Sequence, residues 1–476
     1  MKARRYLGGL AVLFLVIGTA RAEEWLQRYH DPQHTSFINA STEELQSINF
    51  DYIFDPRVPP TGDILIHYTD PLIKSNGEII TPYRECNGTC TITTIVYSVK
   101  KLGVDASEQW NFTSDFRGYP SSWTPVFGIG ANNGLVYAAG ACGSMWVLAE
   151  TDGSFVSKLA SYTLPDDIST CIGQIWTTST PTINTDGTVY WTIRANPNAF
   201  GVKSAIVKAA PDGTITSANF EDLTGDVNQR AALNSAPAIA YDGTIFTVST
   251  TAGQRNSRIL KLDSDFNVIW NSSLVVNIGA GDPGGPCHEA IPNDNGTSSP
   301  VVLPDNSVVF GGWSAGPFCT PFPASECPSS EGFLYKFTPD GQFQACYQFG
   351  WDTTPGVTTI DGNTYLVEKH NHYTATPDFY ELVVLDANTM QKVWTYLEPT
   401  RHEWCIDSPL LDRDGYAVVP SEGGTFYRIK LLSDPPEVTQ VALTRPQSAA
   451  YVPNVGVGGK SYTINNGHLL GAGAAP

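Results

Sequence analysis

Short apolar stretches alternate with polar turns along most of the chain, and one such pattern occurs seven times. Each unit has a small or polar residue before a proline, an apolar stretch, a turn of the Asp-Gly or Asn-Gly type and a second apolar stretch, as in TTSTPTINTDGTVYWT. A tight turn between two apolar runs predicts a β-hairpin. A second strand pair such as SRILKLDSDFNVIW follows, and four antiparallel strands per unit are typical of a β-propeller blade. The seven prolines, about 56 residues apart, are Pro71, Pro125, Pro181, Pro237, Pro300, Pro355 and Pro409.

The two ends of the chain supply the strands for one more blade. The tail contains a hairpin, SYTINNGHLLGAG, and the head contains an extended stretch from Ser47 to Phe54. Closing the ring with strands from both ends would remove exposed sheet edges. We therefore expect an all-β, eight-bladed β-propeller with four antiparallel strands per blade. A seven-bladed ring is the alternative, if the ends only wrap around it.

The first 22 residues have the features of a signal peptide. A basic start is followed by an apolar core from Leu7 to Ala20 and by the small-x-small site Ala20-Arg21-Ala22. No other stretch has the roughly 18 apolar residues that a membrane helix needs. We expect residues 23–476 to form one propeller domain, secreted to the extracellular space, or periplasmic if the source is bacterial, without membrane insertion. In a eukaryotic secretory route it would be a glycoprotein, with sequons at Asn39, Asn87, Asn111, Asn271 and Asn295.

Composition changes the picture mainly by excluding partners. The 476 residues carry a formal net charge of −19, and 16% of them are charged, against about a quarter in an average globular chain. The 43 glycines and 33 prolines fit a protein with many turns. Binding to nucleic acid or to an anionic membrane needs clustered Lys and Arg. We therefore expect no nucleic-acid partner, and we expect a monomer.

Three blade ends resemble the tryptophan-docking repeats of the pyrroloquinoline-quinone (PQQ) type propellers. They run from Val384 to Trp394, from Lys261 to Trp270 and from Ser107 to Trp110, and the segment Trp25 to Phe37 is similar to the leader of that superfamily. The resemblance implies the fold and, for its dehydrogenases, PQQ with Ca2+. Quinoprotein alcohol dehydrogenases typically carry two adjacent cysteines and a longer chain, whereas this sequence has no Cys-Cys pair. PQQ with Ca2+ is therefore an alternative that we do not favour.

In a propeller, the connection from strand 4 to the next blade and the loop from strand 2 to strand 3 lie on one face. Tryptophans on that face would form stacking walls for a sugar ring or an aromatic ligand. They could instead pack between blades, as propeller tryptophans commonly do. The candidate ligand-binding residues there are Trp123, Trp176, Arg230, His288, Glu289, Trp351 and Trp404.

Histidines on the same face are the sharpest sign of chemistry. His370 and His372 are two residues apart on an extended segment, so both imidazoles would project to one side and could bind one metal ion. With His402 and Arg401, they are also candidate catalytic groups for general acid and base chemistry. The alternative is that they are ordinary loop histidines, because no third metal ligand is fixed by the sequence.

Eight of the nine cysteines fall on this face, and we expect them to staple its loops. Plausible local pairs are Cys86 with Cys90, Cys142 with Cys171, and Cys319 with Cys327, with Cys287 and Cys405 as a longer-range pair. Cys346 lies in a predicted strand and would be a buried free thiol.

These features favour a secreted binding propeller that holds a glycan, a small molecule or a protein on the disulfide-stapled face. Two enzymatic alternatives remain: a PQQ-dependent dehydrogenase by analogy with the family, and a carbohydrate-active lyase that uses His, Tyr and Arg on the same face.

Overall fold

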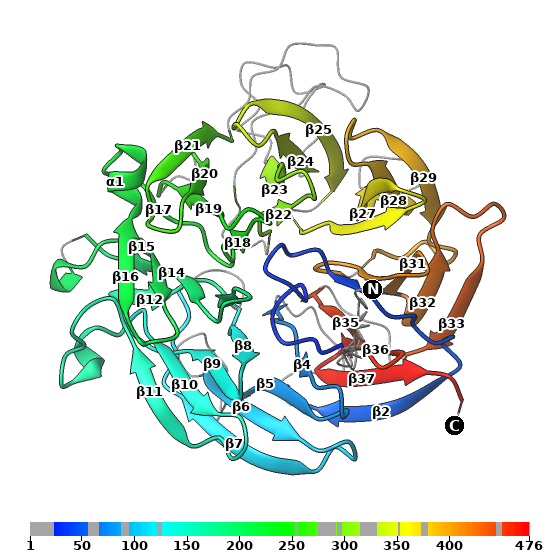
Figure 1. Cartoon of the computed structure of the whole chain (residues 1–476). Coiled ribbons are helices and arrows are strands. Elements are labelled where there is room, and N and C mark those ends of the chain that lie inside the picture. The colour runs from blue at the N-terminus through cyan, green and yellow to red at the C-terminus, as the bar shows by residue number, and fades with distance from the viewer. Residues whose placement is uncertain are drawn as a thin grey trace, which may run out of the picture.

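The computed structural model describes residues 23–55, 66–86, 95–120, 126–197, 199–252, 256–274, 292, 298–314, 331–350, 353–372, 379–404, 406–443 and 450–475. Its strands form eight four-stranded blades arranged in a ring, with the innermost strand of two blades broken into two segments (Figure 1). The predicted eight-bladed β-propeller is confirmed.

The blades follow the sequence repeats. Blade 1 contains β4 (Leu72–Ile73), β5 (Ile79–Cys86), β6 (Ile95–Leu102) and β7 (Glu108–Ser114). Blade 2 contains β8 (Ile129–Asn132), β9 (Leu135–Ala139), β10 (Met145–Ala149) and β11 (Phe155–Leu159). Blade 3 contains β12 (Ile175–Thr177), β13 (Thr182–Ile183), β14 (Val189–Ala195), β15 (Ala205–Ala209) and β16 (Ile215–Asn219). Blade 4 contains β17 (Arg230–Ala231), β18 (Ala238–Ile239), β19 (Ile245–Thr250), β20 (Arg258–Leu262) and β21 (Val268–Ser273).

The second half of the ring has the same order. Blade 5 contains β22 (Val301–Val302), β23 (Val308–Ser314), β24 (Glu331–Phe337) and β25 (Phe343–Gly350). Blade 6 contains β26 (Gly356–Ile360), β27 (Asn363–His372), β28 (Phe379–Asp386) and β29 (Lys392–Leu397). Blade 7 contains β30 (Leu410–Asp412), β31 (Tyr416–Ser421), β32 (Thr425–Lys430) and β33 (Val438–Ala442), with β1 (Phe37–Ile38) parallel to β30. Blade 8 contains β35 (Asn454–Val457), β36 (Lys460–Asn465), β37 (His468–Gly473) and β2 (Ser47–Ile53).

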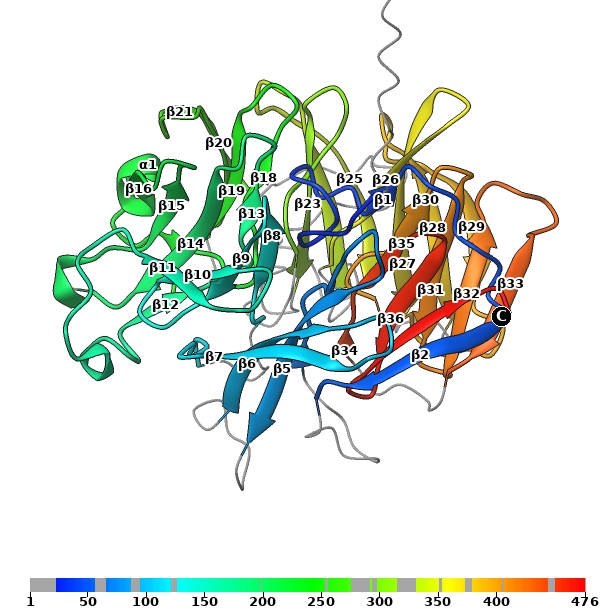
Figure 2. The same cartoon turned by 60° about the horizontal axis from the view of Figure 1, so that its bottom comes forward.

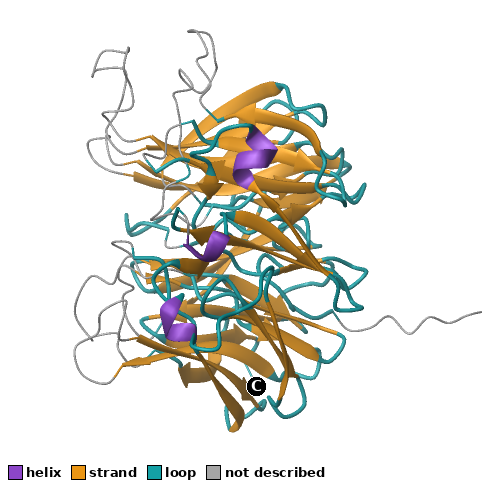
Figure 3. Ribbon diagram, turned by 90° about the vertical axis from the view of Figure 1, so that its left-hand side faces the viewer, coloured by secondary structure: helices purple, strands orange, loops and turns teal. Residues whose placement is uncertain are grey.

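The remaining elements are short. β3 (Ile66–His67) pairs in parallel with β34 (Ala450–Tyr451). The helical segments are η1 (Ile168–Thr170), η2 (Ala199–Gly201) and α1 (Phe220–Thr224), drawn in purple among the strands in Figure 3. Among the described residues, no helix is long and apolar enough to cross a membrane.

Both ends of the chain close the ring. The outer strand of blade 8, β2, comes from the head and pairs antiparallel with β37 of the tail, with Ser47 opposite Gly473 and Ile53 opposite His468. Figure 2 shows these blue and red strands side by side. The predicted closure by head and tail strands is confirmed, and it leaves no blade of the ring open.

Tryptophans at the outer strands dock neighbouring blades onto one another. Trp110 of β7 donates its indole N–H to the Glu150 carbonyl of blade 2 (3.0 Å), and Trp270 of β21 donates to the Pro339 carbonyl of blade 5 (2.9 Å). Each indole lies over a turn glycine with positive φ, Gly153 (69°) and Gly341 (85°) respectively. A Cβ atom at either glycine would lie 2.6 Å from the indole. The docking implied by the repeat resemblance is therefore present, and the turn glycine makes room for it.

A leader segment, residues 25–36, crosses the ring axis on one face, and it contacts seven of the eight blades. It runs as the dark blue trace at the centre of Figure 1, and Figure 2 shows it at the end of the ring opposite the end of β5. Backbone N–H groups of the innermost strands donate to it, at 2.7 to 3.0 Å, from Ile73, Ala131, Ile183, Ile239, Val302, Val357 and Leu411. Six of these donors lie two residues after the repeat proline of their blade, whereas Ala131 of blade 2 lies six residues after Pro125. The leader therefore accepts hydrogen bonds from backbone N–H groups of the innermost strands, which have no further strand of their own blade on that side.

Candidate functional site

In several blades, the residue before the repeat proline ties the blade to the leader at the axis. Asp70 accepts from the Trp25 indole N–H (2.7 Å) and from the Tyr29 backbone N–H (2.8 Å). The hydroxyl of Thr354 donates to the Tyr29 hydroxyl (3.0 Å). The Ser408 hydroxyl contacts that of Ser36 at 2.8 Å. These contacts explain the polar residue before the proline in blades 1, 6 and 7.

A buried ion pair lies at the centre of this network. Arg28 of the leader and Asp407, which precedes blade 7, are 2.7 Å apart, and Tyr29 donates its hydroxyl to the other Asp407 oxygen (3.2 Å). Both side chains of the pair are buried. Two more buried carboxyl groups lie within electrostatic range of this pair. Burial raises the pKa of Asp70 to about 7 and that of Glu368 to about 8, although the positive charge of Arg28 opposes the first shift and that of Lys369 the second. Asp70 is therefore near its midpoint at neutral pH, and Glu368 is largely protonated.

A cavity of about 440 Å³ opens between blades 3 and 4, on the face that carries the 2-to-3 and 4-to-1 connections. It lies between the loop after β14, the connection that contains α1, and Tyr119 of the connection between blades 1 and 2. Its volume is typical of a small-molecule site, for which about 300–1,000 Å³ is usual. We call it the groove; its lining residues are Tyr119, Arg194, Ala195, Asn196, Pro197, Gly201, Val202, Lys203, Ser204, Glu221, Val227, Asn228, Gln229, Arg230 and Ala252.

One wall of the groove is built from a buried arginine. The Arg194 guanidinium donates twice to the Ala231 carbonyl, through Nε (3.0 Å) and Nη2 (2.6 Å). It also lies over the ring of Tyr119, 4.7 Å from its centroid, and Tyr119 in turn packs edge-on against Trp176 at 4.9 Å. A cation over an aromatic face is stabilising where water is excluded. The orientation of Arg194 is therefore fixed before any ligand binds.

The lining of the groove also carries amide groups. Gln229 is buried (5% exposed), lines the groove and donates Nε2 to the Asn256 carbonyl (2.7 Å). Its Oε1 has no hydrogen-bond partner in the part of the chain that the structure describes. One apolar side chain of the lining, Val227, is 80% exposed, and Phe200, which precedes the lining residue Gly201, is 50% exposed with φ of 53°. Exposed apolar side chains next to a polar cavity are typical of a binding site.

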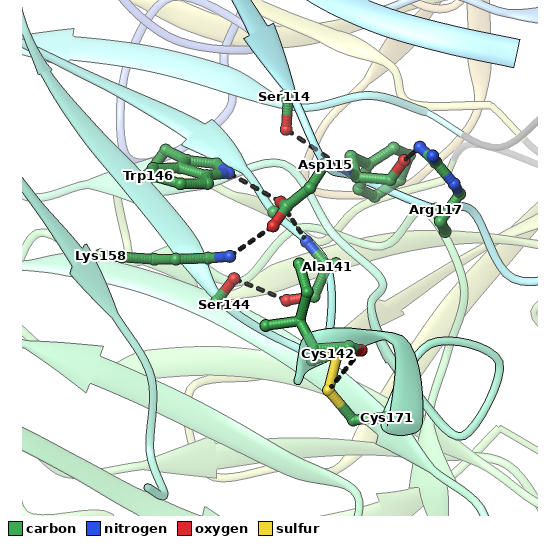
Figure 4. Close-up of polar contacts among 12 residues, drawn as sticks. Ser114, Asp115, Arg117, Ala141, Cys142, Ser144, Trp146, Lys158 and Cys171 are labelled. Atoms are coloured by element: carbon green, nitrogen blue, oxygen red, sulfur yellow. Dashed lines mark hydrogen bonds and ion pairs between the residues drawn. A yellow bond between two sulfur atoms is a disulfide. The ribbon is translucent and has the colours of Figure 1, made fainter. Parts of the chain in front are cut away.

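The neighbouring loops on this face are held by a disulfide. Cys142 and Cys171 are bonded, joining the 2-to-3 loop of blade 2 to the connection between blades 2 and 3, as predicted (Figure 4). In the same view, Asp115 accepts from Ala141 N (2.9 Å), Trp146 Nε1 (2.8 Å) and Lys158 Nζ (2.5 Å). These interactions fix Ala141, which forms a β-bridge to Trp176 and so reaches the aromatic wall of the groove.

Only part of the predicted ligand-binding set meets at the groove. Arg230 lines it, and Trp176 supports it through Tyr119. Trp404 is fully buried and packs between Tyr396 of blade 6 and Tyr427 of blade 7, which is the packing role that we considered as the alternative. The other candidates, Trp123, His288, Glu289 and Trp351, lie outside the described residues.

The predicted catalytic residues lie on other blades. His370, on β27, is buried, and its Nδ1 contacts the Tyr347 hydroxyl of blade 5 at 3.2 Å. His402 contacts the Thr400 hydroxyl at 2.8 Å and, like Arg401, is exposed. His372 belongs to β27, but its side chain lies outside the described residues. In the described part of the chain, no group of three or more His, Cys, Asp or Glu residues could hold a metal ion, so the metal site stays a prediction.

One cysteine prediction is wrong. Cys346 lies on β25 as expected and is buried, but it is disulfide-bonded and is not a free thiol. The buried position in a strand had predicted an inert thiol, but a cysteine in a strand can also form a disulfide. Cys90, Cys287, Cys319, Cys327, Cys405 and the side chain of Cys86 lie outside the described residues.

The sequence analysis missed Arg194 and Arg28. Arg194 had a detectable signal, because it is a lone charge at the end of an otherwise apolar strand, VYWTIRA. Arg28 is one cation in a polar leader, and nothing local marks it as buried.

Comparison with solved structures identifies the fold. A europium-containing methanol dehydrogenase aligns with a TM-score of 0.57 and 10% identity, over 93% of this chain and 89% of that one. A quinohemoprotein alcohol dehydrogenase from Comamonas testosteroni aligns with a TM-score of 0.59 and 10% identity, over 96% of this chain and 82% of that one. A quinohemoprotein alcohol dehydrogenase from Pseudomonas putida aligns with a TM-score of 0.60 and 10% identity, over 96% of this chain and 81% of that one. No family model matches the chain, and no curated protein matches it in sequence. The similarity confirms the PQQ-type propeller architecture, and at this identity it concerns the fold alone.

The described residues at the axis do not fit a calcium–quinone pair. Ca2+ takes six to eight oxygen ligands, whereas both Asp407 oxygens are bonded, one to Arg28 and the other to Tyr29. Asp70 Oδ2 already accepts from the Trp25 indole N–H and the Tyr29 N–H, and Glu368 Oε1 accepts from the Thr353 hydroxyl and the Lys369 N–H. We therefore derive no step through a quinone.

Proposed function

We propose that this protein is a ligand-binding propeller released outside the cytoplasm, and that it holds a small saccharide in the groove between blades 3 and 4. The observation that carries the proposal is the cavity of about 440 Å³, in which Arg194 is already oriented and which the amide residues Asn196, Asn228 and Gln229 also line. Sugar hydroxyls are donors and acceptors, and they suit a wall made of guanidinium and amide groups.

Binding is favoured over catalysis by the chemistry of the lining. Among the described lining residues, Glu221 is the only carboxylic acid, and it is bonded to Lys203. Tyr119 has its ring face covered by Arg194. General acid and base catalysis needs a pair of groups with complementary proton affinities within reach of one atom, and these residues do not provide one.

The disulfide supports the proposed location outside the cytoplasm. Disulfides such as Cys142–Cys171 form and persist in oxidising compartments, which agrees with the predicted signal peptide. Sequencing the N-terminus of the purified mature protein tests this part: a start at Glu23 is expected, and a retained Met1 would contradict it.

The binding proposal can be tested with a glycan array followed by calorimetry on the saccharides retained. Arg230→Ala should weaken binding at least tenfold. A matched control is Lys460→Ala, at a separate cavity of about 240 Å³ between blades 8 and 1, which should leave the affinity unchanged. Binding without loss of substrate supports the proposal. Release of unsaturated products, detected by ultraviolet absorbance, would replace it with lyase activity, and the absence of any retained saccharide would reject it.

A further inference from the structure

We infer that a second ligand site, separate from the groove, lies between blades 8 and 1 and takes a small aromatic acid. It is a cavity of about 240 Å³ with walls from β2, from the β35–β36 hairpin and from the β4–β5 and β6–β7 turns of blade 1. We call it the seam cavity, because the head and the tail of the chain meet blade 1 there. Its lining includes Asn49, Phe50, Val104, Val457, Lys460 and Tyr462. Neither site depends on the other, so the seam cavity goes beyond the proposed saccharide site.

The seam cavity lies on the opposite face of the ring from the groove. Its turns join strand 1 to strand 2 and strand 3 to strand 4 of their blades, whereas the groove lies at the 2-to-3 and 4-to-1 connections. Phe50 belongs to β2 of the head, and Val457 and Lys460 flank the turn of the tail hairpin. A ligand in this cavity would contact both ends of the chain and blade 1 at once, so its binding should hold the ring closed.

The lining of the seam cavity is largely aromatic and aliphatic. Tyr462 is 4% exposed, and its ring meets that of Phe50 edge-on, with the centroids 6.0 Å apart. The Tyr462 ring lies over Gly471, where a Cβ atom would come within 2.7 Å of it. Of the other lining residues, Val457 is buried and Val104 is 65% exposed. Aromatic rings attract a further ring in offset or edge-on arrangements, so this lining favours an aromatic ligand.

The volume of the seam cavity limits the ligand to one ring with a short substituent. A cavity of about 150 Å³ holds benzene, and the seam cavity, at about 240 Å³, leaves room for one more small group. It is smaller than the roughly 300–1,000 Å³ that is usual for larger small-molecule ligands. An oligosaccharide therefore suits the groove and not the seam cavity.

One cation of the seam cavity is available to an acid group. Lys460 is exposed and forms no ion pair with any residue that the structure describes. Lys74, the other cation of the lining, is already held by Glu24 (3.4 Å) and Glu150 (3.2 Å). No carboxylic acid occurs among the described lining residues. Because an exposed ion pair contributes little free energy, the ring should supply most of the affinity and Lys460 the preference for an acid.

The test is NMR titration with benzoate, with its neutral analogue benzamide and with acetate, which lacks the ring. Benzoate should bind about threefold more tightly than benzamide, the difference should shrink at high salt, and acetate should not bind. Lys460→Gln should remove the preference for benzoate, and Lys460→Arg should keep it. Val104→Ser, a change at an exposed position, should weaken binding of both ring compounds several-fold.

A second measurement locates the ligand. Benzoate should raise the melting temperature and slow hydrogen exchange in β2, because the bound state needs the head strand in place. The control is Arg230→Ala, at the groove, which should leave both affinities unchanged; loss of benzoate binding in that variant would place benzoate in the groove.

Three outcomes overturn the inference. Equal binding of benzoate and benzamide rejects the acid class, and absence of binding by either rejects the site. Binding that leaves hydrogen exchange in β2 unchanged rejects the location at the seam. Circular dichroism of each variant confirms that it is folded. All three results leave the saccharide proposal for the groove intact, because that proposal is tested with other ligands.

Discussion

The guanidinium of Arg28 lies 2.7 Å from the carboxylate of Asp407, although 379 residues separate them in sequence. The two residues belong to the leader and to the connection before blade 7, so the contact links the start of the chain to the last part of the ring. Both side chains are excluded from water. A buried pair of this kind is destabilising when only one partner is removed, because the other charge stays buried.

We expect Asp407→Ala to lower the free energy of unfolding by about 3–5 kcal/mol, because Arg28 would be left uncompensated. Chemical denaturation followed by fluorescence measures the change. The exposed pair Arg413–Asp414 provides the control, and Asp414→Ala should change stability by less than about 0.5 kcal/mol. Similar losses in both variants would show that the leader is not tied through this pair.

Stability should fall as pH rises from about 6.5 to 9, owing largely to Glu368. Its pKa is raised by burial to about 8 in the folded state and returns to the usual value near 4.5 on unfolding. The folded state therefore holds a proton that the unfolded state releases, and the stability this gives is lost as pH rises through 8. The pKa of His34 is lowered by burial to about 4, so its own contribution is lost only below about 6.5, outside this window.

Glu368→Gln is the matched variant for this effect. The amide oxygen can still accept from Thr353 and from the Lys369 N–H, as the carboxyl does at 3.0 and 2.7 Å. The wild-type protein should lose on the order of 1–2 kcal/mol between pH 6.5 and 9, and the variant should lose clearly less. Parallel curves for the two proteins would place the pH dependence elsewhere.

The tryptophan docking can be isolated with two turns of the same sequence type. Pro339-Asp340-Gly341 in blade 5 lies under Trp270, whereas Pro211-Asp212-Gly213 in blade 3 has open space around its glycine. Their φ values are almost equal, 85° and 86°, so alanine causes the same backbone strain in both. We expect Gly213→Ala to cost about 1 kcal/mol and Gly341→Ala to cost at least 1–2 kcal/mol more, because the new methyl group would overlap the indole. Equal melting temperatures for the two variants would contradict the docking role.

The sequence was sufficient for features that repeat locally, and insufficient for contacts across the ring. The turn after Pro181 and the motif ending at Trp394 are encoded within short stretches, so the blade count, the closure by β2 and the docking tryptophans could be predicted. The partner of Arg28 could not be, since it is set by where the fold brings residue 407. The same holds for the groove, where Tyr119 from one connection meets Arg194 from another blade. Which loop side chains meet depends on loop paths that no periodicity describes.

The Cys142–Cys171 disulfide should support the groove as well as the fold. It closes a loop of 29 residues, and a loop of this length gives about 3.6 kcal/mol of stability in the chain-entropy model. It also fixes Ala141, whose β-bridge holds Trp176 against Tyr119 and hence beneath Arg194. We expect Cys142→Ser/Cys171→Ser to lower the free energy of unfolding by about 2–4 kcal/mol. The same variant should bind the saccharide several-fold more weakly, and calorimetry should show a less favourable enthalpy of binding. Lys158→Met removes one contact of Asp115, the acceptor of the Ala141 N–H, but leaves the disulfide, and it should produce a smaller loss of both. If the disulfide variant loses stability but retains full affinity, the aromatic wall is held by blade packing alone, and the staple serves only the fold.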